Sequence, residues 1–449
     1  MDDLIRRVVQ EQMPETLGML REYCSKPSVA AKGEGIEEAA GLVRQFFEDL
    51  GASPKILRLE GAHPVVYAEF PGASQKTLLF YNHYDVQPPE PLEEWASPPF
   101  ELVERDGRLF ARGVADNKGD LVSRLAAIKA LLTTHGQLPC RVKFLVEGEE
   151  EIGSVSFPRY IHEYRDLFMA DACIWEYGER DHKERFHIVA GVKGICYVQL
   201  EIENLRTDLH SSLGAILEGA PMRLVWALAG LKGQDGRINV PGFYDRVKKP
   251  GDAELEAAKA IPFDEEEIKQ YVGARSFIGG KQGFDALYDL LFSPTCTICG
   301  LEGGYTGPGS KTVLPRKAMA KVDFRLVPDQ DPEEIADLLR RHLDAQGFSD
   351  ITVTLMGGEK AYRTDLRHPF VRLVMDVARE VTGREVVLYP NSAGTGPMHP
   401  VGMALGVPIV SIGCGYWDSR VHAPNEHIRR KDLEETILLM ARLIERFAV

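Results

Sequence analysis

The chain has 449 residues, of which 44% are hydrophobic and 27% charged, so it is long enough for two folded domains and is neither disordered nor fibrous in composition. Its formal net charge of −14 disfavours nucleic acid and anionic membranes as partners. Seven scattered cysteines, no apolar run of roughly 18 to 20 residues and an amphipathic start without a signal-peptide pattern predict a cytoplasmic protein with reduced thiols.

The first part of the chain has the pattern of an α/β domain. Apolar residues at helical spacing predict helices, and short runs rich in β-branched and aromatic residues predict strands. The predicted strands are apolar stretches separated by turn residues, which is typical of a sheet that is covered on both faces. The predicted elements are helices over 2–24, 36–50 and 120–132 and strands over 64–70, 77–81 and 141–146.

The pattern changes from Gly191 onward and changes back after about Arg363. In between, a strand over 195–202, a helix over 218–231, a long irregular stretch, a strand over 318–327, a helix over 332–345 and a strand over 351–355 follow one another. This order predicts a small α+β sandwich at 189–362, inserted into a domain made of 1–188 and 363–449. The final part is predicted to contain helices over 369–382 and 430–447, a strand over 386–389 and an apolar run over 407–412.

Several short segments, far apart in the chain, are rich in side chains that bind metals. His83 follows a predicted strand, and the carboxyl end of such a strand faces the crevice in which α/β sheets bind ligands. Asp85, two residues on, lies on the same side of an extended chain and can orient the imidazole ring. Asp116 lies in a glycine-rich turn before a helix, Glu176 follows another apolar strand, and His422 lies near the end of the chain.

Three successive carboxylates, Glu149, Glu150 and Glu151, follow the strand that ends near Val146. Like charges packed together are costly unless cations neutralise them or one carboxyl group holds a proton. Each of these segments on its own also fits a structural role: a solvated run of charge, a helix-entry residue or a satisfied core histidine.

In order along the chain, the segments resemble the motifs of one enzyme family. They read HxD at 83–85, ARGxxDxKG at 111–119, EGxEExGS at 147–154 and HxxNE at 422–426. The chain is similar over essentially its whole length to the zinc peptidases that include aminoacylase, carboxypeptidase G and cytosolic carnosine-type dipeptidases, peptidase family M20. The resemblance implies a phosphorylase/hydrolase-like α/β catalytic domain with an inserted α+β, ferredoxin-like domain that serves for dimerisation or as a lid.

The resemblance also implies a role for each of these side chains. Asp116 would bridge two divalent metal ions, His83 and Glu176 would complete one site, and Glu151 and His422 would complete the other. Two cations about 3.5–4 Å apart can share a carboxylate in this way. Imidazole and carboxylate ligands suit Zn²⁺, and Mn²⁺ or Co²⁺ tolerate the same set. Glu150 would be the general base, and Asp85 would orient the imidazole ring of His83.

The inserted domain carries further marks of this family. The segment at 207–211 resembles one whose histidine, here His210, reaches into the partner subunit's active site and stabilises the oxyanion, which implies a homodimer. The segments at 311–317 and 323–328 resemble the dipeptidase branch, so Thr312 and Arg325 are expected to bind substrate, with Arg325 on the free carboxylate. Gly394 and Thr395 lie where relatives place a substrate-binding glycine loop, although the preceding 391–393 departs from the family pattern.

These motifs leave the substrate class open. The dipeptidase-like segments favour a dipeptide, whereas Glu176 stands where dipeptidases more often have Asp and acylases or carboxypeptidases more often have Glu. We therefore expect a metal-dependent amidohydrolase that acts on dipeptides, with N-acyl amino acids as the alternative.

Hypotheses that assign the chain to another functional class have less support in the sequence. The glycine-rich run at 304–312 has the wrong spacing for a phosphate-binding loop, and no GxSxG elbow of a serine hydrolase is present. A non-catalytic binding relative would have lost a ligand or the base, and every such position is filled here.

Overall fold

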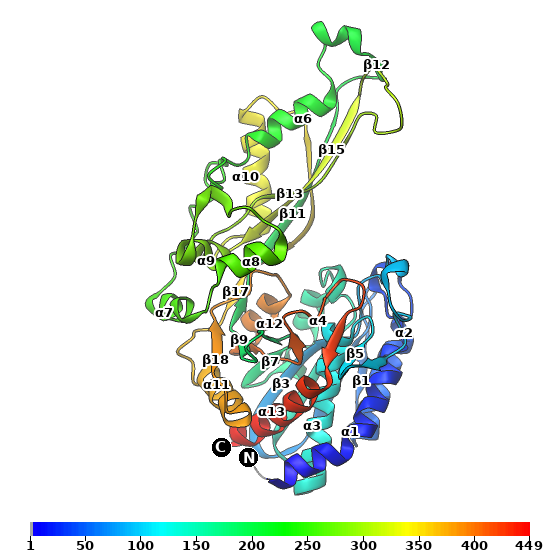
Figure 1. The fold of residues 1–449 in the computed structure, drawn as a ribbon, viewed down its shortest axis with the longest axis vertical. Helices are drawn as coiled ribbons and strands as arrows, with labels where there is room; N and C mark the ends of the chain where they lie inside the picture. Colours follow the sequence, from blue (N-terminus) through cyan, green and yellow to red (C-terminus); the bar gives the residue numbers. More distant parts are fainter. Residues whose placement is uncertain (1–2) are drawn as a thin grey trace. The chain divides into compact units, whose positions relative to one another are not determined.

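The computed structural model describes residues 3–449, which form two compact units (Figure 1). Unit 1 contains the chain up to Gly191 together with Arg363–Pro390 and Pro397–Val449, and unit 2 contains Val192–Tyr362 and Asn391–Gly396. The boundary lies within a few residues of the predicted one. The short segment 391–396, which was predicted to belong to the first domain, is part of unit 2 instead.

Unit 1 is built on a ten-stranded mixed sheet with the order β1-β2-β6-β3-β7-β19-β9-β8-β20, in which β18 also pairs with β9. The central strands β6, β3, β7 and β19 run parallel, as expected from the apolar runs that they contain. The strands are β1 (Lys55–Leu57), β2 (Val65–Phe70), β3 (Gly72–His83), β6 (Leu138–Glu147), β7 (Ala172–Trp175), β8 (Glu179–Arg180), β9 (Phe186–Val189), β18 (Val386–Tyr389), β19 (Ile409–Ser411) and β20 (Gly415–Tyr416).

Helices cover both faces of this sheet. Phe80 and Tyr81 are neighbours on β3 and therefore point to opposite faces. Phe80 packs on Phe144, which contacts Phe47 of one helix, whereas Tyr81 contacts Phe157 of another. The helices of unit 1 are α1 (Asp3–Cys24), α2 (Ile36–Asp49), α3 (Gly119–His135), α4 (Phe157–Glu163), α5 (Arg165–Phe168), α11 (Pro369–Thr382), α12 (Met398–Leu405) and α13 (Arg430–Ala448).

A small sheet outside the main one pairs a segment near the end of the chain with a segment near residue 110. It has the order β21-β5-β4, made of β4 (Val103–Arg105), β5 (Arg108–Phe110) and β21 (His427–Arg429). The pairing of β21 with β5 brings residues near 425 next to residues near 111. Two of the predicted ligands, Asp116 and His422, are thereby drawn together.

Unit 2 has a ferredoxin-like core. Its antiparallel sheet has the order β13-β15-β11-β16, and the chain order is β11, α6, β13, β15, α10, β16, which is two split β-α-β units. Alternate residues of β15 from Ala318 to Leu326 are buried with helix residues in one apolar core. The elements are β11 (Gly194–Glu203), α6 (Ala220–Ala229), β13 (Thr297–Gly303), β15 (Lys317–Leu326), α10 (Pro332–Ala345) and β16 (Thr352–Glu359).

Most predicted elements are present within a few residues of their expected bounds; residue 2 of the first helix lies outside the described residues. The stretch predicted to be irregular contains three short helices, α7 (Asp252–Ala260), α8 (Glu265–Val272) and α9 (Gly283–Phe292), and the edge strand β13. They were missed because the helices are short, with 9, 8 and 10 residues. Within residues 3–449, no helix has the length and apolarity that crossing a membrane requires.

Candidate metal centre

The predicted ligands of unit 1 lie at one edge of its sheet. β6, β3 and β7 are parallel neighbours, so their carboxyl ends meet there. His83 is the last residue of β3, Glu176 directly follows β7, and the turn that carries Glu150 and Glu151 follows β6. The sheet topology therefore converts three distant sequence segments into one cluster.

Asp116 lies at the centre of this cluster. One of its carboxylate oxygens, Oδ1, is 3.1 Å from His83 Nε2, and the other, Oδ2, is 3.1 Å from His422 Nε2. His83 Nε2 is also 3.6 Å from Glu176 Oε2, and His422 Nε2 is 3.1 Å from Glu151 Oε2. The five predicted ligands thus lie in two groups that share Asp116.

The electrostatics of the cluster show a surplus of buried negative charge. Burial raises the pKa of Glu176 to about 8, and burial together with neighbouring carboxylates raises the pKa of Glu150. Hydrogen bonds to Asp116 and Glu151 raise the pKa of His422 to about 10. Burial would also raise the pKa of Asp116, but hydrogen bonds from the two histidines outweigh it and keep that pKa below its usual value. Divalent cations would relieve this repulsion.

The residues present fit such cations. Glu176 Oε2 is buried and has no hydrogen-bond partner among the described residues, although it lies beside His83. Asp116, Glu151 and His422 each offer a ligand atom within 4.8 Å of the others. A buried carboxylate oxygen without a donor is costly, and a metal ion is a natural partner for it.

Glu426 holds the loop that carries Asp116, a role that the sequence did not reveal. Its Oε1 accepts hydrogen bonds from the backbone amides of Ala115 (2.9 Å) and Asp116 (3.1 Å). Its Oε2 accepts from the amide of Gly113 (2.9 Å) and from Arg112 Nη1 (2.8 Å). All four lone-pair directions of one buried carboxylate therefore fix the loop 113–116.

Arg124, on α3, ties together the strands that present two ligands. Its Nη1 donates to the carbonyl of Tyr81 and to Asn82 Oδ1, both at 2.6 Å and next to His83. Its Nη2 donates to the carbonyls of Trp175 and Glu176 at 2.5 and 2.7 Å. In the sequence, Arg124 looked like an ordinary residue of a helix, and only the fold shows what it binds.

The three carboxylates of the acidic turn, Glu149 to Glu151, make different contacts. Glu149 accepts backbone hydrogen bonds from His63 and Ser156, so it is structural. The Asp85 carboxylate accepts the amides of Glu150 (3.3 Å) and Glu151 (3.0 Å), and its Oδ1 lies 3.4 Å from His83 Nδ1. Asp85 thus orients both the histidine and the acidic turn.

Glu151 is tied down by two side chains, whereas the Glu150 carboxylate makes no hydrogen bond to a described residue. Glu151 Oε2 accepts from Gln87 Nε2 (3.0 Å) and lies beside His422. Gln87 was not predicted to belong to the site. A fixed carboxylate suits a ligand, and an untied one beside it suits a group that exchanges protons.

The predicted residues of unit 2 fall into two pairs. His210 Nε2 lies 3.2 Å from Thr312 Oγ1, where β12 (Leu209–His210) pairs with β14 (Val313–Leu314). Arg325 Nη1 donates to Thr395 Oγ1 at 2.7 Å, and the carbonyl of the adjacent Gly394 accepts the amide of Lys193 at 2.9 Å. The segment 391–396 is thus attached to unit 2 by hydrogen bonds.

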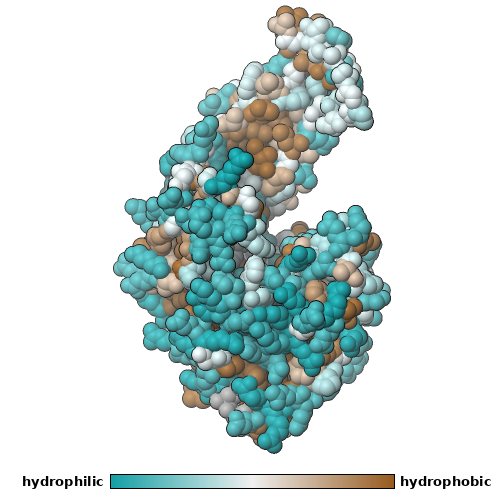
Figure 2. Space-filling model, viewed as in Figure 1, coloured by the Kyte–Doolittle hydropathy of each residue, from teal (hydrophilic) through white to brown (hydrophobic). Residues whose placement is uncertain are grey.

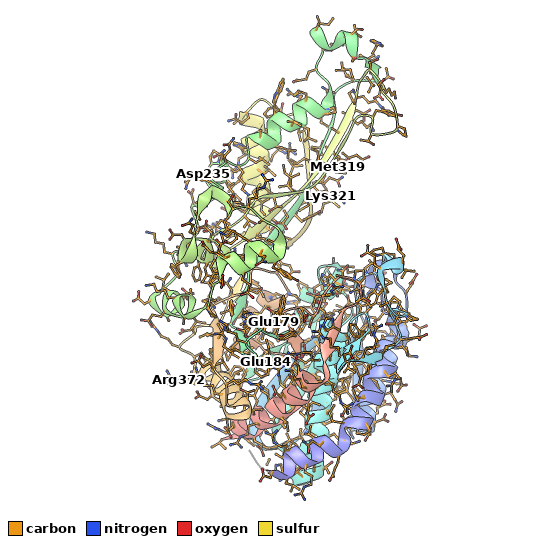
Figure 3. The ribbon with its side chains drawn as sticks, in the orientation of Figure 1. Glu179, Glu184, Asp235, Met319, Lys321 and Arg372 are labelled. Carbon is orange, nitrogen blue, oxygen red and sulfur yellow. The ribbon has the colours of Figure 1, made fainter. Side chains whose placement is uncertain are left out.

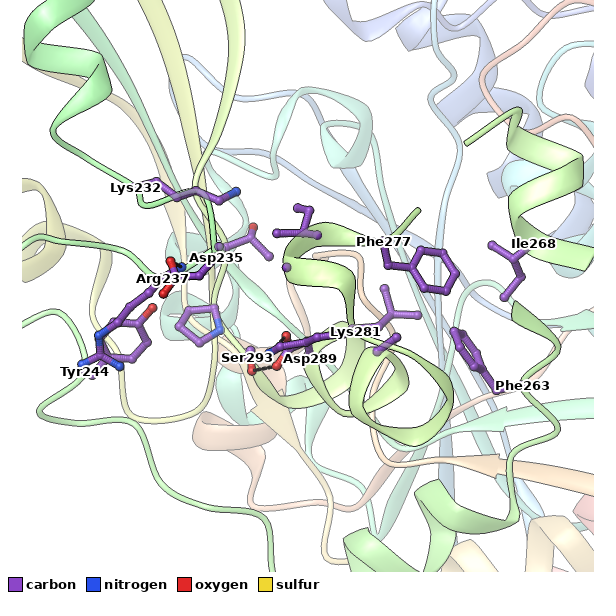
Figure 4. A pocket seen from close by; sticks show the side chains of 17 residues that line it. Lys232, Asp235, Arg237, Tyr244, Phe263, Ile268, Phe277, Lys281, Asp289 and Ser293 are labelled. Carbon is purple, nitrogen blue, oxygen red and sulfur yellow. Dashed lines mark hydrogen bonds and ion pairs between the residues drawn. The ribbon is translucent and has the colours of Figure 1, made fainter. Parts of the chain in front are cut away.

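A cavity of about 710 Å³ lies within unit 2 but contains none of the predicted residues. It is lined by Phe263, Phe277 and Ile278, together with Arg237 and other side chains (Figure 4). Phe263 and Phe277 have ring centroids 6.0 Å apart. The cavity is therefore separate from the metal-ligand cluster, which belongs to unit 1.

Comparison with known proteins identifies the class. The model of peptidase family M20/M25/M40 matches residues 79–446, so the chain belongs to this family. The family predicted from the motifs is confirmed, and with it the class of the protein, a metallopeptidase.

Among curated proteins, the Beta-Ala-His dipeptidase of Homo sapiens is 30% identical over 400 residues, 85% of this chain and 77% of the relative. The Cys-Gly metallodipeptidase dug1 of Schizosaccharomyces pombe is 30% identical over 360 residues, 76% of this chain and 75% of the relative. Among solved structures, an M20 family metallo-carboxypeptidase from Sulfolobus solfataricus is 41% identical with a TM-score of 0.92, covering 97% of this chain and 99% of that one. The predicted fold class is also confirmed.

The Glu426 carboxylate can be tested as a positioning group. Glutamine has the same shape but only one accepting oxygen, so Glu426→Gln places N–H groups against loop amides that need acceptors. We expect metal affinity to fall by about 10- to 100-fold, measured by competition with a chromogenic chelator. The exposed Glu93→Gln is the matched control, and unchanged affinity in Glu426→Gln would exclude this role.

Proposed function

We propose that the protein hydrolyses the amide bond of dipeptides that end in a free carboxylate, with two divalent metal ions in unit 1. The observation that carries this proposal is the placement of Asp116, whose two oxygens each face a different histidine. His83 and Glu176 would hold one ion, and Glu151 and His422 the other. Zn²⁺ suits this donor set best, with Mn²⁺ or Co²⁺ as alternatives.

When bound, the two ions would polarise the substrate carbonyl and lower the pKa of water at the site. The protein's own contribution is proton transfer and positioning. Glu150, unbonded and beside the ligand Glu151, would take the proton of the attacking water and deliver it to the nitrogen of the leaving amine. Asp85 and Glu426 would hold the metal-ligand side chains in position.

The free carboxylate of the substrate would bind Arg325, with Thr395 in contact with it and Gly394 next to Thr395 in the chain. A guanidinium group forms paired hydrogen bonds with a carboxylate, and Arg325 already donates one bond to Thr395. The names of the relatives, two dipeptidases and a carboxypeptidase, all describe cleavage next to a free carboxylate. N-acyl amino acids share this carboxylate and remain the second candidate, for which Glu176 is the supporting observation.

The two pairs of unit 2 support a homodimer. The backbone amide of Arg316 donates a hydrogen bond to Asp208 Oδ1 at 3.0 Å, so the beginning of β15 lies near His210. Arg325 is eight residues further along β15 than Lys317, which is about 27 Å in an extended strand. His210 and Arg325 of one chain are therefore too far apart to contact one dipeptide. We propose that His210 and Thr312 act in the site of the partner subunit.

Unit 2 also offers a surface for this partner. Figure 2 shows a hydrophobic patch on the visible face of unit 2, and its exposed large hydrophobic residues include Val225 and Trp226 of α6 and Ile298 and Leu301 of β13. β13 is an edge strand of the sheet, with unpaired backbone groups on one side. An apolar face beside an open edge suits a second copy of the same sheet.

We also propose a cytoplasmic location. All seven cysteines are free, and Cys299 is the exposed one. Burial raises the pKa of the thiols of Cys24, Cys140, Cys173 and Cys196 to about 12, so these are inert core side chains.

Removal of metal is expected to abolish activity. The cluster of His83, Asp116, Glu151, Glu176 and His422 is proposed to bind two divalent ions per chain. Elemental analysis of the active protein should give two ions, and dialysis against a chelator should inactivate it until a divalent metal is restored. Active protein without metal would contradict the proposal.

The acidic turn allows binding and chemistry to be separated. Glu150→Gln should keep both ions and lose about 10²- to 10⁴-fold in kcat, because the general base is gone. Glu151→Gln should instead weaken binding of one ion, seen as a lower stoichiometry. Glu149→Gln is not a suitable control, because the Glu149 side chain accepts hydrogen bonds from backbone amides. Substitution of the exposed Glu93 by Gln is the control here as well. A Glu150→Gln enzyme with wild-type turnover would refute the assignment.

The role of Arg325 predicts a requirement for a free carboxylate. A dipeptide should be cleaved and its C-terminal amide should not, with a loss in kcat/KM equivalent to about 2–5 kcal/mol if the ion pair is desolvated. In Arg325→Met the two substrates should differ little. A panel that adds N-acyl amino acids distinguishes the two candidate functions, and equal turnover of acid and amide would disprove the role.

Complementation tests the dimer. His210→Ala and Glu150→Gln chains should each be nearly inactive alone. After subunit exchange, a mixed dimer has one site with both substitutions and one with neither, so activity should return towards half per dimer. If no activity returns although exchange is proven by mass-tagged chains, His210 serves its own chain or has no catalytic role.

A further inference from the structure

The carboxylate of Glu359 shares a face of the unit 2 sheet with Arg325. In the register of the sheet, Arg325 lies opposite Ile195 on one side, and Glu359 lies opposite Ile195 on the other. Residues directly opposite one another on neighbouring strands point to the same face. Arg325 alternates with the core residues Phe324 and Leu326, so this is the face away from the apolar core, and Met319 and Lys321 lie on the same strand (Figure 3).

Arg325 forms no hydrogen bond or close ion pair with Glu359 in the described part of the chain. Its guanidinium is engaged by Thr395 Oγ1 at 2.7 Å and by Asp323 Oδ2 at 3.3 Å from Nε. Strands lie about 4.8 Å apart, so the backbones of Arg325 and Glu359 are about 10 Å apart across Ile195. Lys360, the next cation along the chain, is paired with Asp331 at 2.6 Å.

Glu359 is left with an unused acceptor. Its Oε2 is buried and has no hydrogen-bond partner in the described part of the chain. Burial raises the pKa of Glu359 to about 7, and the positive charge of Arg325 opposes that rise. A buried carboxylate oxygen without a donor is destabilising, and a donor from a bound ligand would relieve this cost.

The substrate can supply this partner. In the proposed function, Arg325 holds the carboxylate of the substrate, and the side chain of that same residue begins one carbon away from the bound carboxylate. A side chain with a long apolar stem and a cationic end, as in lysine or arginine, can extend past Ile195 towards Glu359. Its N–H groups would then donate a charge-assisted hydrogen bond to Oε2.

We propose that Glu359 is a specificity determinant that selects substrates whose carboxylate-bearing residue has a cationic side chain. This inference rests on the proposed function and deepens it: Arg325 recognises that the substrate has a C-terminal carboxylate, and Glu359 recognises which residue bears it. A role of Glu359 only in orienting Arg325 would affect all substrates equally, so the two roles can be separated by experiment.

The test compares Ala-Lys with Ala-norleucine, which has the same four-carbon stem without the ammonium group. With metal-loaded enzyme, kcat/KM for Ala-Lys should be about 10- to 100-fold higher, the range of a hydrogen bond to a charged group. Glu359→Gln, which keeps the shape, should remove most of this ratio and leave Ala-norleucine little changed. Glu201→Gln is the control, because Glu201 is exposed on β11 on the same face, six residues or about 20 Å from Ile195.

A second readout does not require turnover. Free L-lysine should inhibit hydrolysis of Ala-norleucine more strongly than L-norleucine does, and Glu359→Gln should abolish this difference. Equal kcat/KM for the two dipeptides in the wild type overturns the inference while leaving dipeptide hydrolysis intact. An equal loss for both substrates in Glu359→Gln also overturns it, since that is the behaviour of a residue that only positions Arg325. If no dipeptide is hydrolysed at all, the proposed function itself fails.

Discussion

The shared carboxylate of Asp116 is the constraint on which the rest of the site depends. It can face both His83 and His422 only if the end of β3, the glycine-rich loop and the C-terminal region converge within hydrogen-bond distance. Glu426 secures this convergence, because it directly precedes β21 and accepts hydrogen bonds from the loop amides of Ala115 and Asp116. The pairing of β21 with β5 therefore helps to bring the candidate metal ligands together.

Much of the fold could be predicted from the sequence, since its signals are local. Strands such as β3 and β6 contain apolar runs, and helices such as α10 and α11 have clear apolar stripes and begin with a proline. The helices α7 to α9 have at most 10 residues and no proline at their start, so their signals are weaker. The transfer of 391–396 to unit 2 also could not be predicted, because it depends on tertiary hydrogen bonds, such as that from Arg325 to Thr395.

The site shows the same division between local and distant signals. Ligand types at strand ends stand out in the sequence, because a histidine or a run of glutamates is unusual directly after an apolar strand. The groups that hold the ligands do not stand out. Arg124 is one arginine within a helix, and Glu426 appears only as the last letter of a motif. Their importance comes from burial and from the number of hydrogen bonds that each makes, which only the folded chain reveals.

The division of residues between the two units has an evolutionary consequence. The candidate metal ligands and Glu150 all belong to unit 1, whereas Arg325, Thr395 and Glu359 belong to unit 2. If the proposed roles hold, mutations in β15 and β16 alter the substrates accepted without disturbing the candidate metal ligands. In a descendant of this chain, substitutions on one face of the unit 2 sheet could change the substrate specificity while natural selection keeps the candidate metal ligands unchanged. Such separation of inherited chemistry from adaptable recognition is one physical basis for the diversification of an enzyme lineage.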